Sequence, residues 1–442
     1  MSRAARRRGR PRAGLVVAAI VLAVVGPTAG VAGAGTSAKG APAACRRDRS
    51  ACVRVGIGQP IVLGALLDRT QLNGQDTSTA VDLALDYLDG RFDGVDGALL
   101  GHRVVLLQQE DGCSAKVTQL NQQQLLDDPN LVAVIGTTCS SAALGVADRA
   151  FSERRIPLVS PANTAPGLTA PSTHQPYYFR TSWNDRIQAA VDANFAASRK
   201  WSRLTVVANP DDAYSAQLGR AFVDAARRNR GQATVVERTP GTDPAATAAA
   251  VAATDPQMIF LTVLPPDCID VAKVLRSDPA TAAVPMLVSE ACGDAEFLDR
   301  LGPASDGVFA SGPDFSFYDE NAFYRTVFLD AYRRRAGVDP PTAFHAQAFD
   351  AAQLVFDAIR RATTGRPGGE LYIDRRALRT ALLRTSGYPG LSGVLTCHED
   401  GDCAQDVRIG IYQAPGWPTR SQASADKVFS QSLSLAQLRS ND

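Results

Sequence analysis

The sequence predicts an α/β protein with two lobes, each built on a doubly wound parallel sheet. Short apolar runs alternate with amphipathic helical segments from about residue 53 to 289. The connections between them are short, a pattern that favours parallel sheets covered by helices on both faces. There are more apolar runs than one sheet comfortably holds, so we expect two similar lobes.

The first 34 residues have the pattern of a secretory signal peptide. Five arginines between positions 6 and 12 precede 13 apolar residues (13–25) and an Ala32-Gly33-Ala34 site, so we expect cleavage near Ala34. The run is shorter than the roughly 20 residues of a membrane span. The alternative, a lipid anchor on Cys45, lacks the expected upstream Leu. Removing this segment leaves 40 basic and 45 acidic residues, and that charge of −5 gives no electrostatic reason to bind nucleic acid.

Eight cysteines in an exported chain favour disulfides. The spacing leaves the connectivity open, and the pairing of sequence neighbours gives Cys45–Cys52, Cys113–Cys139, Cys268–Cys292 and Cys397–Cys403. A metal site is the alternative. The short pairs are not C-x2-C, and the four histidines are scattered, so we expect neither a metal nor a cofactor.

In the first half, residues 35–51 read as a flexible leader. A strand at 53–57 is followed by a polar, glycine-bearing loop over 58–75. Further elements are expected as helices at 79–88 and 141–151, a helix after Cys113, strands at 103–109, 132–135 and 156–159, and an extended segment at 177–183.

In the second half, four strands alternate with helices: strands 204–208, 233–237, 258–263 and 286–289, helices 185–199, 217–228, 244–253 and 270–276. Helices at 321–335, 343–363 and 375–384 follow. Strands at 392–395 and 407–412 are expected to form a hairpin around the turn 397–403. This acidic turn lacks the twelve-residue calcium pattern, so a disulfide-clamped hairpin is favoured.

Several segments together resemble the periplasmic leucine/isoleucine/valine-binding proteins of ABC transporters. They include EDGCSAKVTQLNQQQLLDDPNLVAVIGTTCSSAA and IPLVSPANTAPGLT, and the similarity runs over residues 53–413. The resemblance implies a type I periplasmic binding protein fold, in which three hinge crossings join the lobes and ligand lies between them. It divides the chain into lobe 1 (52–183 and 314–388), lobe 2 (184–313 and a closing hairpin, 389–430) and a tail (431–442).

The resemblance also implies a binding site for an amino acid. A carboxylate would meet Ser140 at a helix start, in the Ser140-Ser141 turn. Ala162, Asn163 and Thr164 would hold carboxylate and ammonium, Glu290 would pair with the ammonium, and Tyr214 would cover the ligand. Each has a plain alternative: an N-cap serine, a Pro-bracketed turn, a solvated loop carboxylate and a packed tyrosine.

Two departures from the family put leucine specificity in doubt. Asp267 aligns where the family usually places an aromatic residue, and the loop 64–77 contains none. Trp183, at the first crossing, is the candidate substitute. A carboxylate beside the cleft would disfavour an aliphatic side chain and tolerate a polar or cationic one.

We therefore expect an extracytoplasmic, monomeric solute-binding protein that delivers an amino acid or small amide to an ABC permease. The alternative keeps the fold but makes it a ligand sensor or an interaction module without transport. An enzyme is disfavoured, because no G-x-S-x-G elbow is present and no histidine lies near the Cys139-Ser140-Ser141 turn.

Overall fold

The computed structural model describes residues 41–414 and 427–439. The expected signal peptide (1–34) lies outside the described residues. Of the expected flexible leader, residues 43–51 form two short helices, α1 (Ala43–Arg47) and η2 (Arg49–Ala51), and Cys45 is buried. The first predicted strand is β1 (Cys52–Val55). It pairs antiparallel with β14 (Leu371–Asp374), which also pairs with β13 (Thr363–Gly365), so it belongs to a small sheet of its own.

The first large sheet has six strands in the order β3-β4-β2-β5-β6-β7. Its strands are β2 (Ile61–Leu66), β3 (Ala98–Leu99), β4 (His102–Gln109), β5 (Leu131–Gly136), β6 (Leu158–Ser160) and β7 (Tyr178–Arg180). All pairs except β3–β4 are parallel. The carboxyl ends of five strands therefore meet at one edge, where ligands bind in such sheets.

The prediction of a polar loop over 58–75 is wrong, because β2 lies there and is buried along its whole length. It pairs with both β4 and β5 at the centre of the sheet. Gly64 is needed for close packing: a Cβ there would lie 3.1 Å from Val134 and 3.2 Å from Leu125. The glycine therefore marks a tight contact inside a strand.

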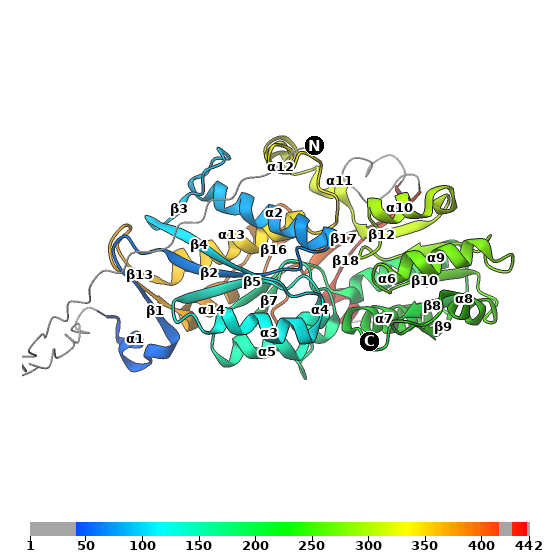
Figure 1. The fold of residues 1–442 in the computed structure, drawn as a ribbon, viewed down its shortest axis with the longest axis horizontal. Helices are drawn as coiled ribbons and strands as arrows, with labels where there is room; N and C mark the ends of the chain where they lie inside the picture. Colours follow the sequence, from blue (N-terminus) through cyan, green and yellow to red (C-terminus); the bar gives the residue numbers. More distant parts are fainter. Residues whose placement is uncertain (1–40, 415–426, 440–442) are drawn as a thin grey trace, which may run out of the picture. The chain divides into compact units, whose positions relative to one another are not determined.

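Helices cover both faces of this sheet (Figure 1). One face packs against α2 (Leu72–Asp86), α12 (Leu329–Ala336) and α13 (His345–Ala362), and the other against α3 (Ala115–Leu126) and α5 (Asp148–Glu153). We call the sheet with these helices the first lobe. Because both faces are covered, its strands read as continuous apolar runs.

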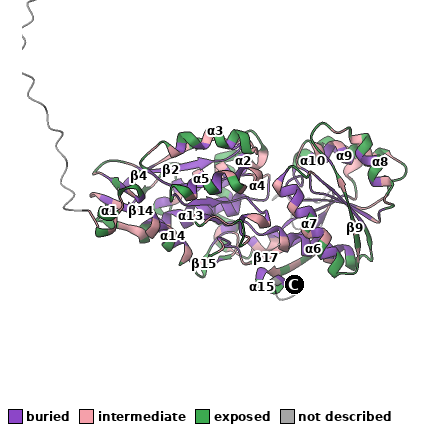
Figure 2. Cartoon of the chain, turned by 90° about the horizontal axis from the view of Figure 1, so that it is seen from below, coloured by how far each residue is buried: buried purple, intermediate pink, exposed green. Residues whose placement is uncertain are grey.

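The second large sheet has seven strands in the order β18-β17-β12-β11-β10-β8-β9. They are β8 (Arg203–Ala208), β9 (Gln232–Glu237), β10 (Met258–Leu261), β11 (Met286–Val288), β12 (Phe309–Pro313), β17 (Asp406–Gln413) and β18 (Lys427–Ser434). The helices around it are α6 (Asp185–Ser198), α7 (Ala213–Arg228), α8 (Pro244–Ala252), α9 (Asp267–Ser277) and α10 (Ala295–Leu301). We call this the second lobe. The buried residues lie mainly on the strands and on the inner faces of helices in both lobes (Figure 2).

The chain passes between the two sheets three times. It leaves the first after β7 and returns after β12 through α11 (Phe315–Tyr318), η7 (Tyr324–Phe328), α12, α13 and α14 (Arg375–Leu383). It ends with β17, β18 and α15 (Leu435–Arg439). The residue boundaries of the lobes given by the resemblance stay predictions.

The predicted pairing of the last two strands is wrong. Strand β16 (Val394–Leu395) pairs with β15 (Tyr388–Pro389), and the partner of β17 is β18. Residues 431–434, expected in a tail, are thus part of the second sheet. The turn 397–403 instead packs against β7, where the Arg180 N–H donates to Gly401 and the Cys403 N–H donates to Arg180.

Candidate functional site

A small cavity of about 40 Å³ lies where the strand ends of the two lobes face each other. Four residues expected at the site, Ser140, Ala162, Tyr214 and Glu290, line it together. The remaining lining residues are Gln71, Asn73, Cys113, Thr138, Cys139, Leu264, Pro265, Ala291 and Phe344. Both lobes thus contribute to one cavity, with Ser140 and Ala162 on the first lobe and Tyr214 and Glu290 on the second.

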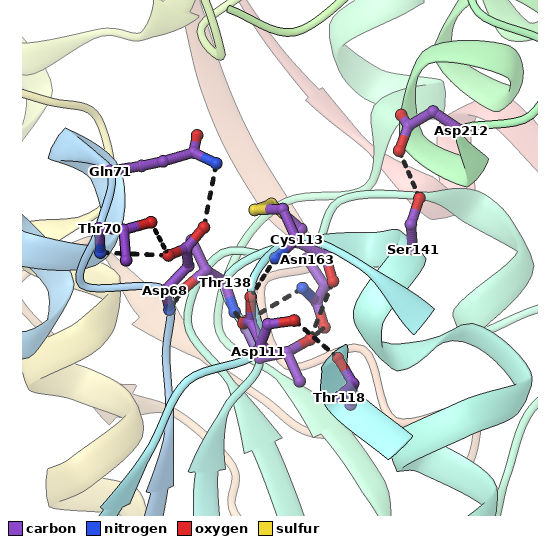
Figure 3. Close-up of a disulfide and its surroundings, with 12 residues drawn as sticks. Asp68, Thr70, Gln71, Asp111, Cys113, Thr118, Thr138, Ser141, Asn163 and Asp212 are labelled. Atoms are coloured by element: carbon purple, nitrogen blue, oxygen red, sulfur yellow. Dashed lines mark hydrogen bonds between the residues drawn. A yellow bond between two sulfur atoms is a disulfide. The ribbon is translucent and has the colours of Figure 1, made fainter. Parts of the chain in front are cut away.

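The Ser140 wall is fixed by its own hydrogen bonds and by the Cys113–Cys139 disulfide (Figure 3). The buried Asp111 carboxylate accepts the backbone N–H groups of Cys113 (2.8 Å) and Thr138 (2.5 Å). Burial raises the pKa of Asp111 to about 7. The Ser140 hydroxyl accepts from the Ala165 N–H at 3.2 Å, which joins this turn to the loop after β6. The helix starting here is short: α4 (Ser140–Ala142) runs into a π-turn, η4 (Ala143–Ala147), which is kinked at Leu144 and Gly145.

Asn163 holds the neighbouring loop in place and does not line the cavity. Its amide exchanges hydrogen bonds of 3.0 Å with the hydroxyl and carbonyl groups of Thr137. The fully buried Arg180 guanidinium donates to the carbonyls of Asn163 (3.2 Å) and Ala165 (3.0 Å) and forms an ion pair with Asp402. Asn163 thus has a structural role, and its expected contact with ligand stays a prediction.

The second-lobe wall is organised around the Glu290 carboxylate, which follows β11 and is 4% exposed. The Tyr214 hydroxyl donates to one of its oxygens at 2.7 Å, and the Gln188 amide donates to the other at 2.6 Å. Burial raises the pKa of Glu290, and these two hydrogen bonds partly oppose the shift. Both partners are neutral, so neither of them neutralises the charge of an ionised Glu290.

Asp185, at the start of α6, does not line the cavity, but its charge interacts with that of Glu290, and sequence reasoning missed it. It is fully buried, and the neutral Thr164 hydroxyl is the side-chain group that favours its ionised form by hydrogen bonding. Thr164, expected at the site, is likewise buried, and the Asp185 N–H donates to the Thr164 carbonyl at 2.9 Å. Burial raises the pKa of Asp185 well above its ordinary value, and the nearby Glu290 raises it further.

Ser141 and Asp267, both expected at the site, are not among the residues that line this cavity. The Ser141 hydroxyl donates to the Asp212 carboxylate and accepts from the Ala213 N–H at 2.9 Å, so it joins the two lobes (Figure 3). The Asp267 carboxylate forms an ion pair of 2.8 Å with Arg238 inside the second lobe. Leu264 and Pro265, just before it, line the cavity instead.

The aromatic wall comes from Phe344 and not from Trp183. Phe344 lines the cavity, and Trp183 stacks on it with ring centroids 5.1 Å apart. The indole N–H of Trp183 donates to Gln188 at 2.7 Å, so this buried ring supports both Phe344 and the residue that holds Glu290. No local pattern in the sequence marks Phe344, because it lies 161 positions from Trp183.

The geometry agrees with a family match over most of the chain. Residues 60–414 match a family model described as "Periplasmic binding protein". The chain belongs to the periplasmic binding protein family. Glutamate receptor 3.4 of Arabidopsis thaliana is 27% identical to this chain over 150 residues, which are 34% of this chain and 15% of the receptor. An amino acid binding protein of Pseudomonas aeruginosa is 25% identical over 131 residues, 30% of this chain and 33% of the relative. The chain thus spans one third or less of these curated relatives.

Solved structures of periplasmic binding proteins share the whole fold. A leucine-binding protein from Thermotoga maritima superposes with a TM-score of 0.72 at 20% identity, covering 85% of this chain and 99% of the other. A solute-binding protein from R. palustris in complex with benzoate gives 0.66 at 17% identity, covering 84% and 97%. The family resemblance and the type I fold expected from the sequence are confirmed.

Two further observations on this periplasmic binding protein concern membrane-spanning helices and metal ions. Among the described residues, no helix has the length and apolar character needed to cross a membrane. Asp111, Cys113 and Cys139 lie close enough to hold a metal ion, but the two sulfur atoms are bonded to each other. Neither sulfur is therefore a thiolate ligand. The structure contains all four neighbour-paired disulfides.

Proposed function

We propose that this protein is an extracytoplasmic solute-binding protein that captures an α-amino acid between its lobes for a membrane ABC permease. The ligand carboxylate would bind at Ser140 and the backbone beside it. The ammonium would bind between Glu290, Asp185 and Thr164. An amino acid carries both groups on one carbon, so it bridges the two lobes.

Two buried carboxylates without a neutralising cation carry this proposal. Glu290 is bonded only to neutral groups, and the side chain that favours ionised Asp185 by hydrogen bonding, Thr164, is neutral as well. The arginine nearest to Asp185 in charge interaction, Arg180, is already paired with Asp402. A buried charge is costly unless it is paired. A ligand ammonium is the group that this arrangement lacks, whereas benzoate, bound by one structural relative, would bring only a carboxylate.

Ligand would act by stabilising the closed arrangement of the lobes. Ser141 on the first lobe bonds to Asp212 and Ala213 on the second. The Gly167 N–H similarly donates to Gln217 at 2.6 Å. A ligand shifts an open–closed equilibrium only by its different affinity for the two states. An amino acid touching both walls has that difference, because the open state offers it one wall at a time.

Titration calorimetry of ligand-free protein tests the proposal. Protein stripped of ligand under denaturing conditions and refolded with its disulfides intact should bind at least one of the twenty L-amino acids, but not benzoate. Glu290→Gln should weaken that binding at least tenfold. An exposed carboxylate change on α5, Glu153→Gln, is the matched control. Absence of binding by every amino acid would reject the proposal.

Localisation and assembly are inferred from the same set of features. We infer export through the amino-terminal signal peptide and action as a monomer; four disulfides suit an oxidising compartment. The partial match to a plant receptor favours a second candidate, a ligand sensor. Co-purification after crosslinking in the source membrane distinguishes them: a permease supports transport, and a signalling protein supports the sensor.

A further inference from the structure

The cavity at Ser140 and Glu290 adjoins a second, larger space of about 980 Å³ that is open to solvent and that we call the outer chamber. Four residues line both spaces: Gln71, Asn73, Pro265 and Ala291. Ser140, Ala162, Tyr214 and Glu290 line only the inner one. A ligand whose amino acid head meets Ser140 and Glu290 therefore has a path for its side chain past the shared residues into the outer chamber.

The inner cavity is too small to enclose a large side chain. Its 40 Å³ compares with the roughly 30 Å³ that one water occupies in the liquid. The amino acid head uses that space. A leucine-sized side chain would reach the shared residues, where a pair of amide side chains, Gln71 and Asn73, forms the first-lobe wall.

These amides favour a ligand side chain that donates hydrogen bonds. Within the described residues, the Asn73 Oδ1 is buried and has no donor. The Gln71 amide nitrogen donates to Asp68 at 3.0 Å, which holds that side chain in place (Figure 3). An unpaired buried acceptor destabilises the site, and a donor on the ligand would remove that cost.

The outer chamber is predominantly negative. Four carboxylates line it, Asp294, Glu296, Asp299 and Asp339, against one guanidinium, Arg300. That arginine is engaged by Glu296 (3.2 Å) and by Asp270 outside the chamber (3.5 Å), and Asp339 pairs with Arg333 at 2.6 Å. Asp299 forms no ion pair within the described part of the chain. Asp294 caps α10 through the Phe297 N–H, and burial raises its pKa to about 6.

We propose that the ligand is an α-amino acid with a long basic side chain, of the lysine, ornithine or arginine class. Its amine or guanidine passes Asn73 and ends beside Asp299 in the outer chamber. This inference rests on the proposed function and narrows it.

Calorimetric titration of the ligand-free protein with L-arginine, L-lysine, L-glutamine and L-leucine tests the inference. L-arginine or L-lysine should bind at least tenfold more tightly than the other two. Asp299→Asn and Asn73→Ala should each weaken binding of the basic amino acid at least threefold. The Glu153→Gln control should change no affinity.

The outcomes separate this inference from the proposed function. The preference for a basic side chain is rejected if L-leucine or L-glutamine binds as tightly as L-arginine and L-lysine. It is also rejected if Asp299→Asn leaves the affinity for L-arginine and L-lysine unchanged. In both cases the proposal of amino acid binding stands. If none of the twenty L-amino acids binds, both fail.

Discussion

At the scale of single residues, the candidate site is defined by carboxylates that the fold buries without a cation. Asp185, Glu290 and Asp192 are all nearly or fully inaccessible, and burial raises the pKa of each. Glu290 and Asp192 are linked through Gln188 and Ser311: Gln188 donates to Glu290 and to Ser311, and the Ser311 hydroxyl donates to Asp192. Such groups destabilise the empty protein and become favourable when a cationic ligand arrives.

Asp185→Asn should therefore separate stability from binding. Removing a buried uncompensated charge should leave the melting temperature of the empty protein unchanged or raise it, because desolvation disfavours the ionised carboxylate. Amino acid affinity should fall at least tenfold in calorimetry. The exposed Glu153→Gln, outside this cluster of carboxylates, is the control, and it should leave both the melting temperature and the affinity unchanged. A large loss of stability in Asp185→Asn would contradict this account.

Ligand binding should release protons. The raised pKa values of Asp185 and Glu290 mean that the empty folded state holds protons the unfolded chain has lost, so its stability should fall as pH rises from about 4 through those values. An ammonium ligand favours the ionised forms, so affinity should weaken as pH is lowered through the same window. Calorimetry in two buffers of different ionisation enthalpy measures the release. An equal heat of binding in both buffers would argue against it.

At the scale of elements, a buried ion pair ties the closing segment of the chain to the loop after β6. Arg180, at the end of β7, pairs with Asp402 of the turn 397–403 and donates to the carbonyls of Asn163 and Ala165. The same turn makes backbone hydrogen bonds to Arg180. This link places a carboxyl-terminal segment directly behind one wall of the site.

Asp402→Asn should destabilise the protein by about 3–5 kcal/mol, the usual cost of leaving one member of a buried ion pair unmatched. Urea unfolding followed by circular dichroism measures the loss. The double change Arg180→Leu with Asp402→Leu should recover part of it, because no unpaired charge remains. A loss below about 1 kcal/mol in the single variant would show that water reaches the pair.

Elements were predicted correctly where the local sequence pattern matches the surroundings of the folded segment. Elements and residues were missed where that pattern has a commoner explanation. Strands β5, β8 and β10 were found because an apolar run bounded by polar turns is what a doubly covered strand requires. Strand β2 was missed because Gly64 suggested a loop, although it serves close packing. Asp185 was missed because an acid in the first turn of a helix is common for reasons of dipole alone.

At the scale of the whole molecule, the affinity of the site depends on contacts that ligand does not make. Ser141→Ala removes the hydroxyl that joins Asp212 and Ala213 across the lobes. A hydrogen bond to a charged group contributes about 1.5–3 kcal/mol, so affinity should fall by roughly tenfold or more. Stopped-flow fluorescence should show faster dissociation. The control Ser277→Ala, on an exposed part of α9, should leave the rate unchanged, and an unaltered dissociation rate in Ser141→Ala would rule out this contact as a latch.

The positions of the four disulfides decide which parts of the molecule oxidation makes rigid. The Cys113–Cys139 disulfide stiffens the first-lobe wall beside Ser140. The Cys268–Cys292 disulfide stiffens the second lobe, two residues beyond Glu290. Cys45–Cys52 and Cys397–Cys403 close loops of seven and six residues, so they too are local. All eight cysteines are consumed without a covalent tie from one lobe to the other. Because no disulfide joins the lobes, oxidation leaves the proposed opening and closing of the lobes unconstrained.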